Sequence, residues 1–387
     1  MRLIPVALTL LSLAGWLYLL LGRARFWRAD QRLPSLSSEL RLWPSVVAVM
    51  PARNEAAFVG RALASLRRQL YKGTLTIIVV DDQSEDATAD AARQAGEGAG
   101  HPVEVVAGKP PPTGWAGKVW AMAQGEERSR EIAPRARYIW FADADVEHDP
   151  DVLSRLVQRA DRFQLDLVST MVMLHCRGLW ERLLIPAFVF FFQKLYPFPS
   201  VNSPVKPVAA AAGGSMLVRR TALGEAGGLA AIRSALIDDC ALAALLKRGG
   251  RIWLGLTDSA RSLRPYGLSG VWATVTRTAF TELGHSPLRL IGAVVGMVLL
   301  YLVPVAGFFL GVLEAQPTPA ILGGLGWLAM SAAYRPTLRL YGQPALLGPL
   351  LPLAAGLYVL MTLDSARKWR RAPLASPRWS SSTDWRT

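Results

Sequence analysis

Apolar stretches long enough to span a membrane lie at the two ends of this chain of 387 residues. Residues 3–22 contain no charged side chain. Three further uncharged runs cover residues 290–313, 315–334 and 340–363. An apolar helix of about 20 residues crosses the hydrocarbon core of a bilayer. The pattern therefore predicts an N-terminal membrane anchor over residues 1–22 and a C-terminal transmembrane region over residues 286–364, with two to three helices.

The middle C-terminal run, residues 315–334, is the weakest of the predicted spans. It contains Pro317, Pro319, Gly323, Gly324 and Gly326. Basic residues follow both the N-terminal run and the last C-terminal run, so the positive-inside rule favours an even number of crossings between them. We therefore expect residues 315–334 to be re-entrant or interfacial, with three or four crossings in the whole chain.

Short apolar runs alternate with helical stretches between residues 40 and 285. The runs at residues 45–50, 75–80, 102–106 and 138–142 predict buried strands. We expect helices over residues 56–70 and from residue 87 onward. This alternation predicts an α/β domain with a mostly parallel sheet over residues 40–285.

Carboxylates follow two of the predicted strands. Asp81 and Asp82 come after the second strand, and Asp143 and Asp145 come after the fourth. The carboxyl ends of parallel strands line one crevice, where ligands bind in such sheets. Carboxylates in close proximity suit a hard divalent cation that also binds substrate phosphates, although a lone Asp-x-Asp is more often a solvated turn.

The composition decides which classes of protein remain. The chain is 51% hydrophobic and contains only two cysteines, which excludes a disordered protein and a disulfide scaffold. Its net charge of +14 fits either a nucleic acid partner or a membrane. Arginines follow the apolar ends directly, so we expect a membrane and no nucleic acid. A cleaved signal peptide fits less well, because the charge lies after the apolar run. Residues 365–387 are predicted to form a basic cytoplasmic tail.

Five ordered motifs resemble the family 2 glycosyltransferases of the GT-A fold, a Rossmann-like nucleotide-diphospho-sugar transferase fold. They lie at residues 51–55, 80–88, 141–145, 213–215 and 237–239. The resemblance covers about residues 45–285. The whole layout also resembles the hopene-associated glycosyltransferases, bacterial membrane proteins linked with hopanoid lipids. Those proteins have one anchor before the domain and a hydrophobic C-terminal region.

The resemblance implies roles for the donor side of the site. Asp81 or Asp82 would bind the uracil and ribose of a UDP-sugar, and Asp82 is favoured. Asp143 and Asp145 match the motif that holds the diphosphate through Mg²⁺ or Mn²⁺. The residues implied to line the nucleotide pocket after the first strand are Pro51, Arg53 and Glu55.

The resemblance also implies that Asp239 is the general base, with Asp238 beside it. The family usually has Glu-Asp here, so Asp238 departs from the pattern. The alternative is that both residues only cap the helix predicted after them. The Gln-x-x-Arg-Trp motif of processive members is absent; Arg264 and Arg277 lie in a loosely similar place, which puts polymer synthesis in doubt.

Three further residues are candidates with ordinary alternatives. Lys118, before a predicted helix, can meet phosphate or be a plain surface lysine. Gly214 can bring the backbone close to the sugar or form a tight turn. Arg277, like Arg264, can bind the diphosphate in a bidentate way or face solvent or lipid. The apolar run at residues 183–192 is too short to span; we favour an interfacial helix that admits a lipid acceptor over a core helix.

Together these observations predict a membrane-bound inverting glycosyltransferase that uses a UDP-sugar, Mg²⁺ or Mn²⁺, and a lipid acceptor. Hopanoid is the acceptor class that the resemblance implies. The expected location is a bacterial inner membrane, crossed several times, with the catalytic domain in the cytoplasm. The alternatives are a polyprenyl-phosphate glycosyltransferase or polysaccharide synthase, and a catalytically inactive scaffold that binds a nucleotide-sugar.

Overall fold

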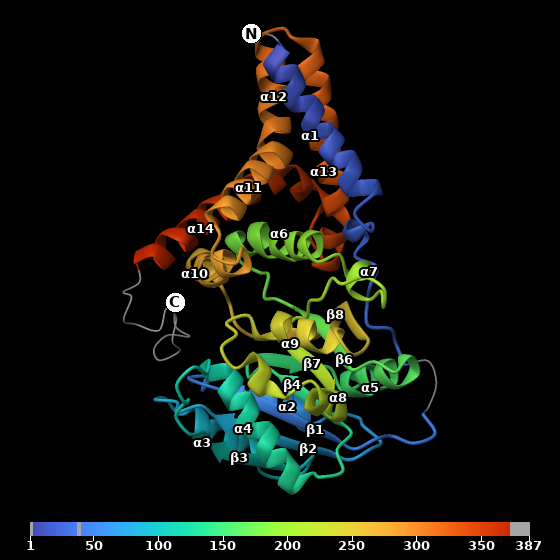
Figure 1. Cartoon of the computed structure of the whole chain (residues 1–387), viewed down its shortest axis with the longest axis vertical. Coiled ribbons are helices and arrows are strands. Elements are labelled where there is room, and N and C mark those ends of the chain that lie inside the picture. Colours follow the sequence, from blue (N-terminus) through green and yellow to red (C-terminus); the bar gives the residue numbers. More distant parts are fainter. Residues whose placement is uncertain (1–2, 37–39, 372–387) are drawn as a thin grey trace.

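A computed structural model describes residues 3–36 and 40–371, which form a sheet domain and a helical part joined to it (Figure 1). The strands are β1 (Val46–Ala52), β2 (Leu75–Asp81), β3 (Val103–Ala107), β4 (Tyr138–Ala142), β5 (Val146–His148), β6 (Leu167–Met173), β7 (Ser215–Arg219) and β8 (Ile252–Ser262). The helices of the sheet domain are α2 (Val59–Arg67), α3 (Thr88–Gly96), α4 (Gly117–Ile132), α5 (Val152–Phe163), α8 (Arg220–Glu225) and α9 (Asp238–Lys247). The other helices are α1 (Leu3–Leu21), α6 (Leu179–Leu195), α7 (Phe198–Val201), α10 (Gly267–Glu282), α11 (Pro287–Met297), α12 (Val303–Leu313), α13 (Pro317–Leu340) and α14 (Leu351–Arg371).

The strands form one mixed sheet in the order β3-β2-β1-β4-β7-β6-β8-β5. The four strands predicted from the sequence, β1 to β4, are confirmed and pair in parallel. The later strand β7 runs antiparallel to β4 and β6, so the sheet is less uniformly parallel than predicted. The parallel register aligns the ends of β1 and β2, with Ala52 opposite Asp81. The segments that follow these strands therefore meet at one edge of the sheet.

Both faces of the sheet are covered, which explains the continuous apolar runs in its strands. In β1, Val46, Ala48 and Met50 belong to one hydrophobic cluster, which includes residues of α2 and α5. The alternate residues Val47 and Val49 belong to a second cluster, which includes residues of α4 and α6. The rigid sheet holds the loops after β1, β2 and β4 in fixed positions.

Helices α1, α12 and α13 lie side by side and project from the sheet domain (Figure 1). The indole Nε1 of Trp16 donates a hydrogen bond of 2.6 Å to the carbonyl of Leu300. Three described helices are long and apolar enough to cross a membrane, by length and composition. They are Leu3–Leu21, Pro287–Leu313 (α11, a π-helical turn and α12) and Ala345–Arg371, which includes α14.

The middle C-terminal run, predicted to be the weakest of the spans, is not among these three helices. It forms one continuous helix, α13, which packs along α12 and α1 (Figure 1). Its glycines make this packing possible, because a Cβ atom at Gly323 would lie 2.5 Å from the carbonyl oxygen of Pro304. A Cβ atom at Gly311 would meet the Ala320 backbone nitrogen at the same distance. Small residues here allow two helices to approach closely, as in membrane helix pairs.

The last C-terminal run is displaced along the chain from its predicted position. A turn at Tyr341–Pro344, with Gly342 at φ +62°, separates α13 from the next helix. Helix α14 then continues to Arg371, so the start of the predicted basic tail is helical. Residues 372–387 of that tail lie outside the described residues. In Figure 1, α14 leaves the projecting helices and runs beside α10.

Helix α6 contains the apolar run at residues 183–192. The apolar residues Leu184, Ile185, Val189 and Phe190 are fully buried or nearly so. Helix α6 packs against α10, α13 and α14, between the sheet and the projecting helices (Figure 1). The favoured interfacial helix with an exposed apolar face is therefore wrong, since these side chains face protein.

Candidate active site

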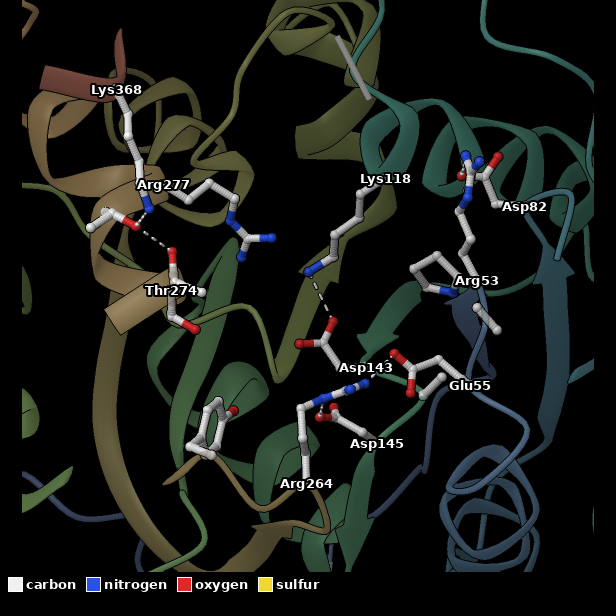
Figure 2. Close-up of a pocket in the computed structure, with 17 residues that line it drawn as sticks. Arg53, Glu55, Asp82, Lys118, Asp143, Asp145, Arg264, Thr274, Arg277 and Lys368 are labelled. Atoms are coloured by element: carbon white, nitrogen blue, oxygen red, sulfur yellow. Dashed lines mark hydrogen bonds and ion pairs between the residues drawn. The ribbon is translucent and has the colours of Figure 1, made fainter. Parts of the chain in front are cut away.

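Asp82, Asp143 and Asp145 of the two predicted acidic clusters line one cavity of about 280 Å³ at the carboxyl ends of β1, β2 and β4. The residues that line it are Pro51, Ala52, Arg53, Glu55, Asp82, Lys118, Ala121, Asp143, Ala144, Asp145, Arg264, Tyr266, Ala273, Thr274, Thr276, Arg277 and Lys368. Figure 2 shows their charged side chains around this cavity. Strand ends supply one side of the cavity, and α10 and α14 supply the opposite side.

Asp82 marks the end of the cavity nearest β2. It is 2% exposed, and neither of its carboxylate oxygens receives a hydrogen bond from the residues that the structure describes. Arg53 lies 3.7 Å away as an ion pair. Burial raises the pKa of Asp82, and the Arg53 guanidinium opposes this rise. A buried acceptor without donors is costly unless a ligand supplies them, which suits the base and ribose of a nucleotide. Asp81 is not among the lining residues.

Lys118 lies in the centre of the cavity at the start of α4. Its Nζ is 2.9 Å from Asp143 Oδ1 and 3.5 Å from Asp238 Oδ2 (Figure 2). Burial alone would lower the pKa of this lysine, but Asp143 and Asp238 hold it above its ordinary value. Lys118 is therefore a fixed positive charge rather than a plain surface lysine.

Arg264 joins the carboxylates of two different loops. Its Nε lies 3.1 Å from Asp145 Oδ2, and another nitrogen of its guanidinium donates to Glu55 (Figure 2). Burial raises the pKa of Glu55 to about 7, although the Arg264 charge opposes the change. Nothing in the local sequence around Arg264 indicated this pairing, because it depends on chain segments that are far apart.

Glu181, at the start of α6, fixes the segment that carries Arg264 and Tyr266. Its carboxylate accepts hydrogen bonds from the backbone nitrogens of Arg177, Gly178 and Tyr266. Burial favours the neutral acid, but these hydrogen bonds outweigh it and lower the pKa of Glu181 to about 2. Glu181 is not among the residues predicted from the sequence, since a glutamate in the first turn of a helix usually needs no explanation beyond capping.

Asp239, in the first turn of α9, is not among the residues that line this cavity, nor is Asp238; Asp239 lies near Lys118, which does line it, with Gly213 next to both. Its Oδ2 accepts a hydrogen bond of 2.8 Å from the Gly213 nitrogen, and its Oδ1 accepts one of 2.7 Å from the Cys240 nitrogen. Burial, followed by the charge of Asp238, raises the pKa of Asp239 to about 7, while Lys118 opposes the rise. A carboxylate poised near neutral pH is suited to accept a proton from a substrate hydroxyl.

Gly213, the neighbour of the predicted Gly214, lies close to two of the charged side chains. A Cβ atom at Gly213 would lie 3.3 Å from Lys118 Nζ and 3.4 Å from Asp239 Oδ2, which leaves little room for any side chain. Gly214 instead packs against Val172 and Val146, away from the cavity lining. Gly213 thus brings the backbone just before β7 close to the carboxylate of Asp239.

The residues present fit a divalent cation that is completed by substrate. Asp143 and Asp145 both line the cavity and provide the oxygen ligands that Mg²⁺ and Mn²⁺ prefer. The described residues contain no group of three or more His, Cys, Asp or Glu side chains placed to hold a metal alone. Phosphate oxygens and water would supply the remaining ligands, as is usual for Mg²⁺ at phosphate sites.

The opposite side of the cavity comes from the two helices next to the projecting ones. Arg277, a predicted site residue, and Thr274 contribute from α10, and Lys368 contributes from α14 (Figure 2). The sequence analysis assigned Lys368 to the basic tail. Only the packing of α14 on α10 brings it to the cavity.

The model of a protein family described as "Glycosyl transferase family 2" matches residues 47–227 of this chain. No curated protein matches this chain significantly. Among solved structures, the mannosyltransferase PcManGT from Pyrobaculum calidifontis, in complex with GDP-Man and Mn²⁺, is similar with a TM-score of 0.54 at 18% identity. The match covers 95% of this chain and 100% of that one.

A second solved structure is similar over a smaller region. Glucosyl-3-phosphoglycerate synthase from Mycobacterium tuberculosis, in complex with Mg²⁺ and UDP, is 16% identical with a TM-score of 0.40. That match covers 62% of this chain and 79% of the other. The sheet domain has the GT-A fold, and the family match supports a glycosyltransferase enzyme.

Proposed function

We propose that the chain is a membrane-bound inverting glycosyltransferase that moves a sugar from a UDP-sugar to the hydroxyl of a lipid, with hopanoids as the first acceptor class to test. The observation that carries the proposal is the composition of the cavity. Acidic residues from the ends of the strands face basic residues from α10 and α14, next to the helices suited to a membrane. A nucleotide-sugar and a lipid headgroup would therefore meet in the same space.

In this mechanism, one set of residues acts on the departing diphosphate and another acts on the attacking hydroxyl of the acceptor. A divalent cation held by Asp143 and Asp145 would neutralise charge on the departing diphosphate. Lys118, 2.9 Å from Asp143, adds a fixed positive charge at the same place. Asp239 would take the proton of the acceptor hydroxyl as that oxygen attacks the anomeric carbon. A single displacement without an enzyme nucleophile inverts the configuration at that carbon.

In this proposal, Asp82 and Arg53 bind the nucleotide of the donor. The unsatisfied, buried carboxylate of Asp82 suits the N–H of uracil and the ribose hydroxyls. Arg53 lies beside it, and Pro51 and Glu55 line the same end of the cavity. We keep UDP as the proposed carrier and Mg²⁺ or Mn²⁺ as the cofactor.

A panel of donors tests this function. Purified protein in phosphatidylcholine nanodiscs would receive radiolabelled UDP-sugars or GDP-mannose, with lipid extracts that contain or lack hopanoids. We expect label from one UDP-sugar in a lipid product that needs the divalent cation and the hopanoid extract. Transfer from GDP-mannose alone would overturn the UDP assignment, and equal transfer with both extracts would overturn the hopanoid acceptor.

We propose that the sheet domain lies in the cytoplasm and that the membrane is a bacterial inner membrane crossed several times. Arg23 and Arg25 follow α1, and Arg370 and Arg371 end α14. Both basic segments lie toward the sheet domain, whereas the turn between α12 and α13 lies at the far end of the projecting helices (Figure 1). This arrangement agrees with the positive-inside rule if α1, α11–α12 and α13 cross and α14 stays near the cytoplasmic interface. It places α13 in the membrane because of its packing along α12 and α1, although by length and composition α14, and not α13, is a candidate span.

Cysteine labelling tests this orientation. A maleimide that cannot cross membranes should label Glu314→Cys in intact spheroplasts, because Glu314 lies in the outer turn after α12. It should label Arg371→Cys only after lysis. The unsubstituted chain, with Cys176 and Cys240, gives the background. Labelling of Arg371→Cys in intact cells would contradict the proposed topology.

A further inference from the structure

Lys194 is a half-buried lysine in the last turn of α6 and lies outside the lining of the catalytic cavity. Its Nζ donates a hydrogen bond of 3.1 Å to the hydroxyl of Tyr301 and lies 3.4 Å from the sulfur of Met297. The same nitrogen lies 4.7 Å from the ring centre of Tyr301 and 5.2 Å from that of Phe191. These contacts hold the ammonium group in place, but none of the three residues carries a negative charge.

Arg23 adds a second positive charge beside Lys194. Its Nε donates a hydrogen bond of 3.2 Å to the carbonyl of Lys194, and its Nη2 donates one of 3.2 Å to the carbonyl of Leu195. The guanidinium has further N–H groups beyond these two bonds. Two cations from distant parts of the chain, the end of α1 and the end of α6, therefore lie together.

No carboxylate compensates these two charges within residues 3–36 and 40–371. Neither Lys194 nor Arg23 forms an ion pair with a described Asp or Glu side chain. Glu282, at the end of α10, instead accepts a hydrogen bond from the hydroxyl of Tyr196. Burial, followed by the charge of Arg23, lowers the pKa of Lys194 to about 7. An anion bound to both cations would relieve their repulsion and the cost of the half-buried charge.

The place of this pair is defined by packing between helices suited to a membrane. Tyr301 is fully buried in the π-helical turn Val298–Leu302, which lies inside the candidate span Pro287–Leu313. Trp16 of α1 packs against Tyr301, with ring centres 5.4 Å apart. Single π-helical turns are frequent at functional sites. The position of the Lys194 ammonium is thus fixed by α1, α6 and this turn together.

Apolar surface starts directly beside the two cations. Tyr18 and Leu21, in the last residues of α1 before Arg23, are 60% and 78% exposed. Leu195, which follows Lys194, is 48% exposed. The end of α1 lies toward the sheet domain, at the base of the projecting helices (Figure 1). A ligand at this place can therefore present an anionic group to the cations and an acyl chain to the helix surface.

We propose that Lys194 and Arg23 bind the phosphate group of an anionic phospholipid from the cytoplasmic leaflet, whose acyl chains lie along the end of α1. This inference uses the proposed membrane location of α1, but not the transfer reaction. Both cations can donate charge-assisted hydrogen bonds to a phosphate. Basic pockets between membrane helices on the cytoplasmic side are typical sites for anionic headgroups. The bound lipid would join α1 to α6 at the membrane surface.

Equilibrium binding to the purified full chain in a neutral detergent tests this site without nucleotide or sugar. The probe is radiolabelled dioleoyl phosphatidylglycerol, and dioleoylglycerol is the matched lipid with the same acyl chains and no phosphate. We expect Lys194→Met to lower the affinity for phosphatidylglycerol roughly tenfold or more, and Arg23→Gln to lower it as well. Methionine replaces the aliphatic part of the lysine and removes the uncompensated charge, so the unfolding temperature of Lys194→Met without lipid should not fall.

Arg370→Gln is the matched control. Arg370 is exposed in the last turn of α14, so its substitution removes a charge elsewhere at the proposed membrane surface and should change the affinity little. Equal binding of both lipids by the wild type, unchanged affinity in Lys194→Met, equal losses in Lys194→Met and Arg370→Gln, or full competition by inorganic phosphate would each overturn the inference. UDP binding with Mn²⁺, measured on the same samples, tests the proposed function separately.

Discussion

Asp239→Asn should reduce sugar transfer by about 10²–10⁴-fold while the protein still binds UDP. The amide keeps the size of the side chain but cannot accept the proton of the acceptor hydroxyl. One carboxylate oxygen of Asp239 accepts from the Gly213 nitrogen and the other from the Cys240 nitrogen. The amide oxygen of asparagine can accept only one of these two hydrogen bonds, and its NH2 group would face the other backbone N–H, so UDP binding has to show that the start of α9 keeps its fold. Initial rates and UDP binding measured on the same sample separate the two effects.

The matched control for this variant is Asp258→Asn. Asp258 is an exposed carboxylate on β8 and is not among the residues that line the cavity. Its substitution should leave transfer within a factor of about two. If Asp239→Asn retains wild-type turnover, Asp239 only caps α9 and another group removes the proton.

The pH profile gives an independent reading of the same residue. Burial raises the pKa of Asp239 to about 7, so the carboxylate is protonated below this pH and ionised above it. Because only the ionised form accepts a proton, the transfer rate should rise through about pH 7. Residual transfer by Asp239→Asn should lack this acidic limb.

Asp145→Ala should remove most of the metal-dependent part of nucleotide binding. Loss of an outer-shell partner typically lowers the affinity for a metal ion roughly 10–100-fold. Loss of a carboxylate that binds the cation directly is expected to lower this affinity by more. Arg264 would also lose its partner at 3.1 Å and keep only Glu55. Titration of UDP with and without Mn²⁺ measures the effect, as the difference between the two affinities should shrink toward zero.

Glu147→Gln is the control for this metal experiment. Glu147 lies two residues after Asp145, on β5, and pairs with Arg61 outside the cavity lining. Its substitution should leave the Mn²⁺ dependence of UDP binding unchanged. An unchanged Mn²⁺ dependence in Asp145→Ala would remove Asp145 from the metal site.

The part of the fold that depends on local apolar pattern was predictable. Strands β1, β2, β3 and β4 are runs of mostly apolar residues between turns, and each is found within two residues of its predicted position. The prolines and glycines of residues 315–334 make this run the weakest predicted span, but they do not interrupt helix α13. Pro317 and Pro319 lie in its first turn, where proline is tolerated, and Gly323 faces α12. Which face a glycine presents to a neighbour is not visible in one sequence.

In the candidate site, too, the residues next to predicted strands were predictable and the residues brought in by long-range packing were not. Asp82, Asp143 and Asp145 follow predicted strands, so the sheet topology brings them to one cavity as expected. Arg264 was predicted as a candidate partner of the diphosphate, but its pairing with Glu55 and Asp145 was not, and Lys368 was not predicted at all, because each reaches the cavity through a long-range contact. Arg264 does so after β8, and Lys368 through the packing of α14 on α10. Lys368 follows a predicted membrane span, and basic residues in such a place indicate only the orientation of the span in the membrane.

The most direct test of the central claim is the partition of labelled sugar between lipid and water. Wild-type protein and Asp239→Asn, in membranes that contain the acceptor lipid, would receive sugar-labelled UDP-donor with Mn²⁺. The account predicts that label moves into an organic-extractable lipid with the wild type and Mn²⁺, and not with Asp239→Asn or without the cation. Label released only as free sugar in water, or equal lipid labelling by both proteins, would contradict it.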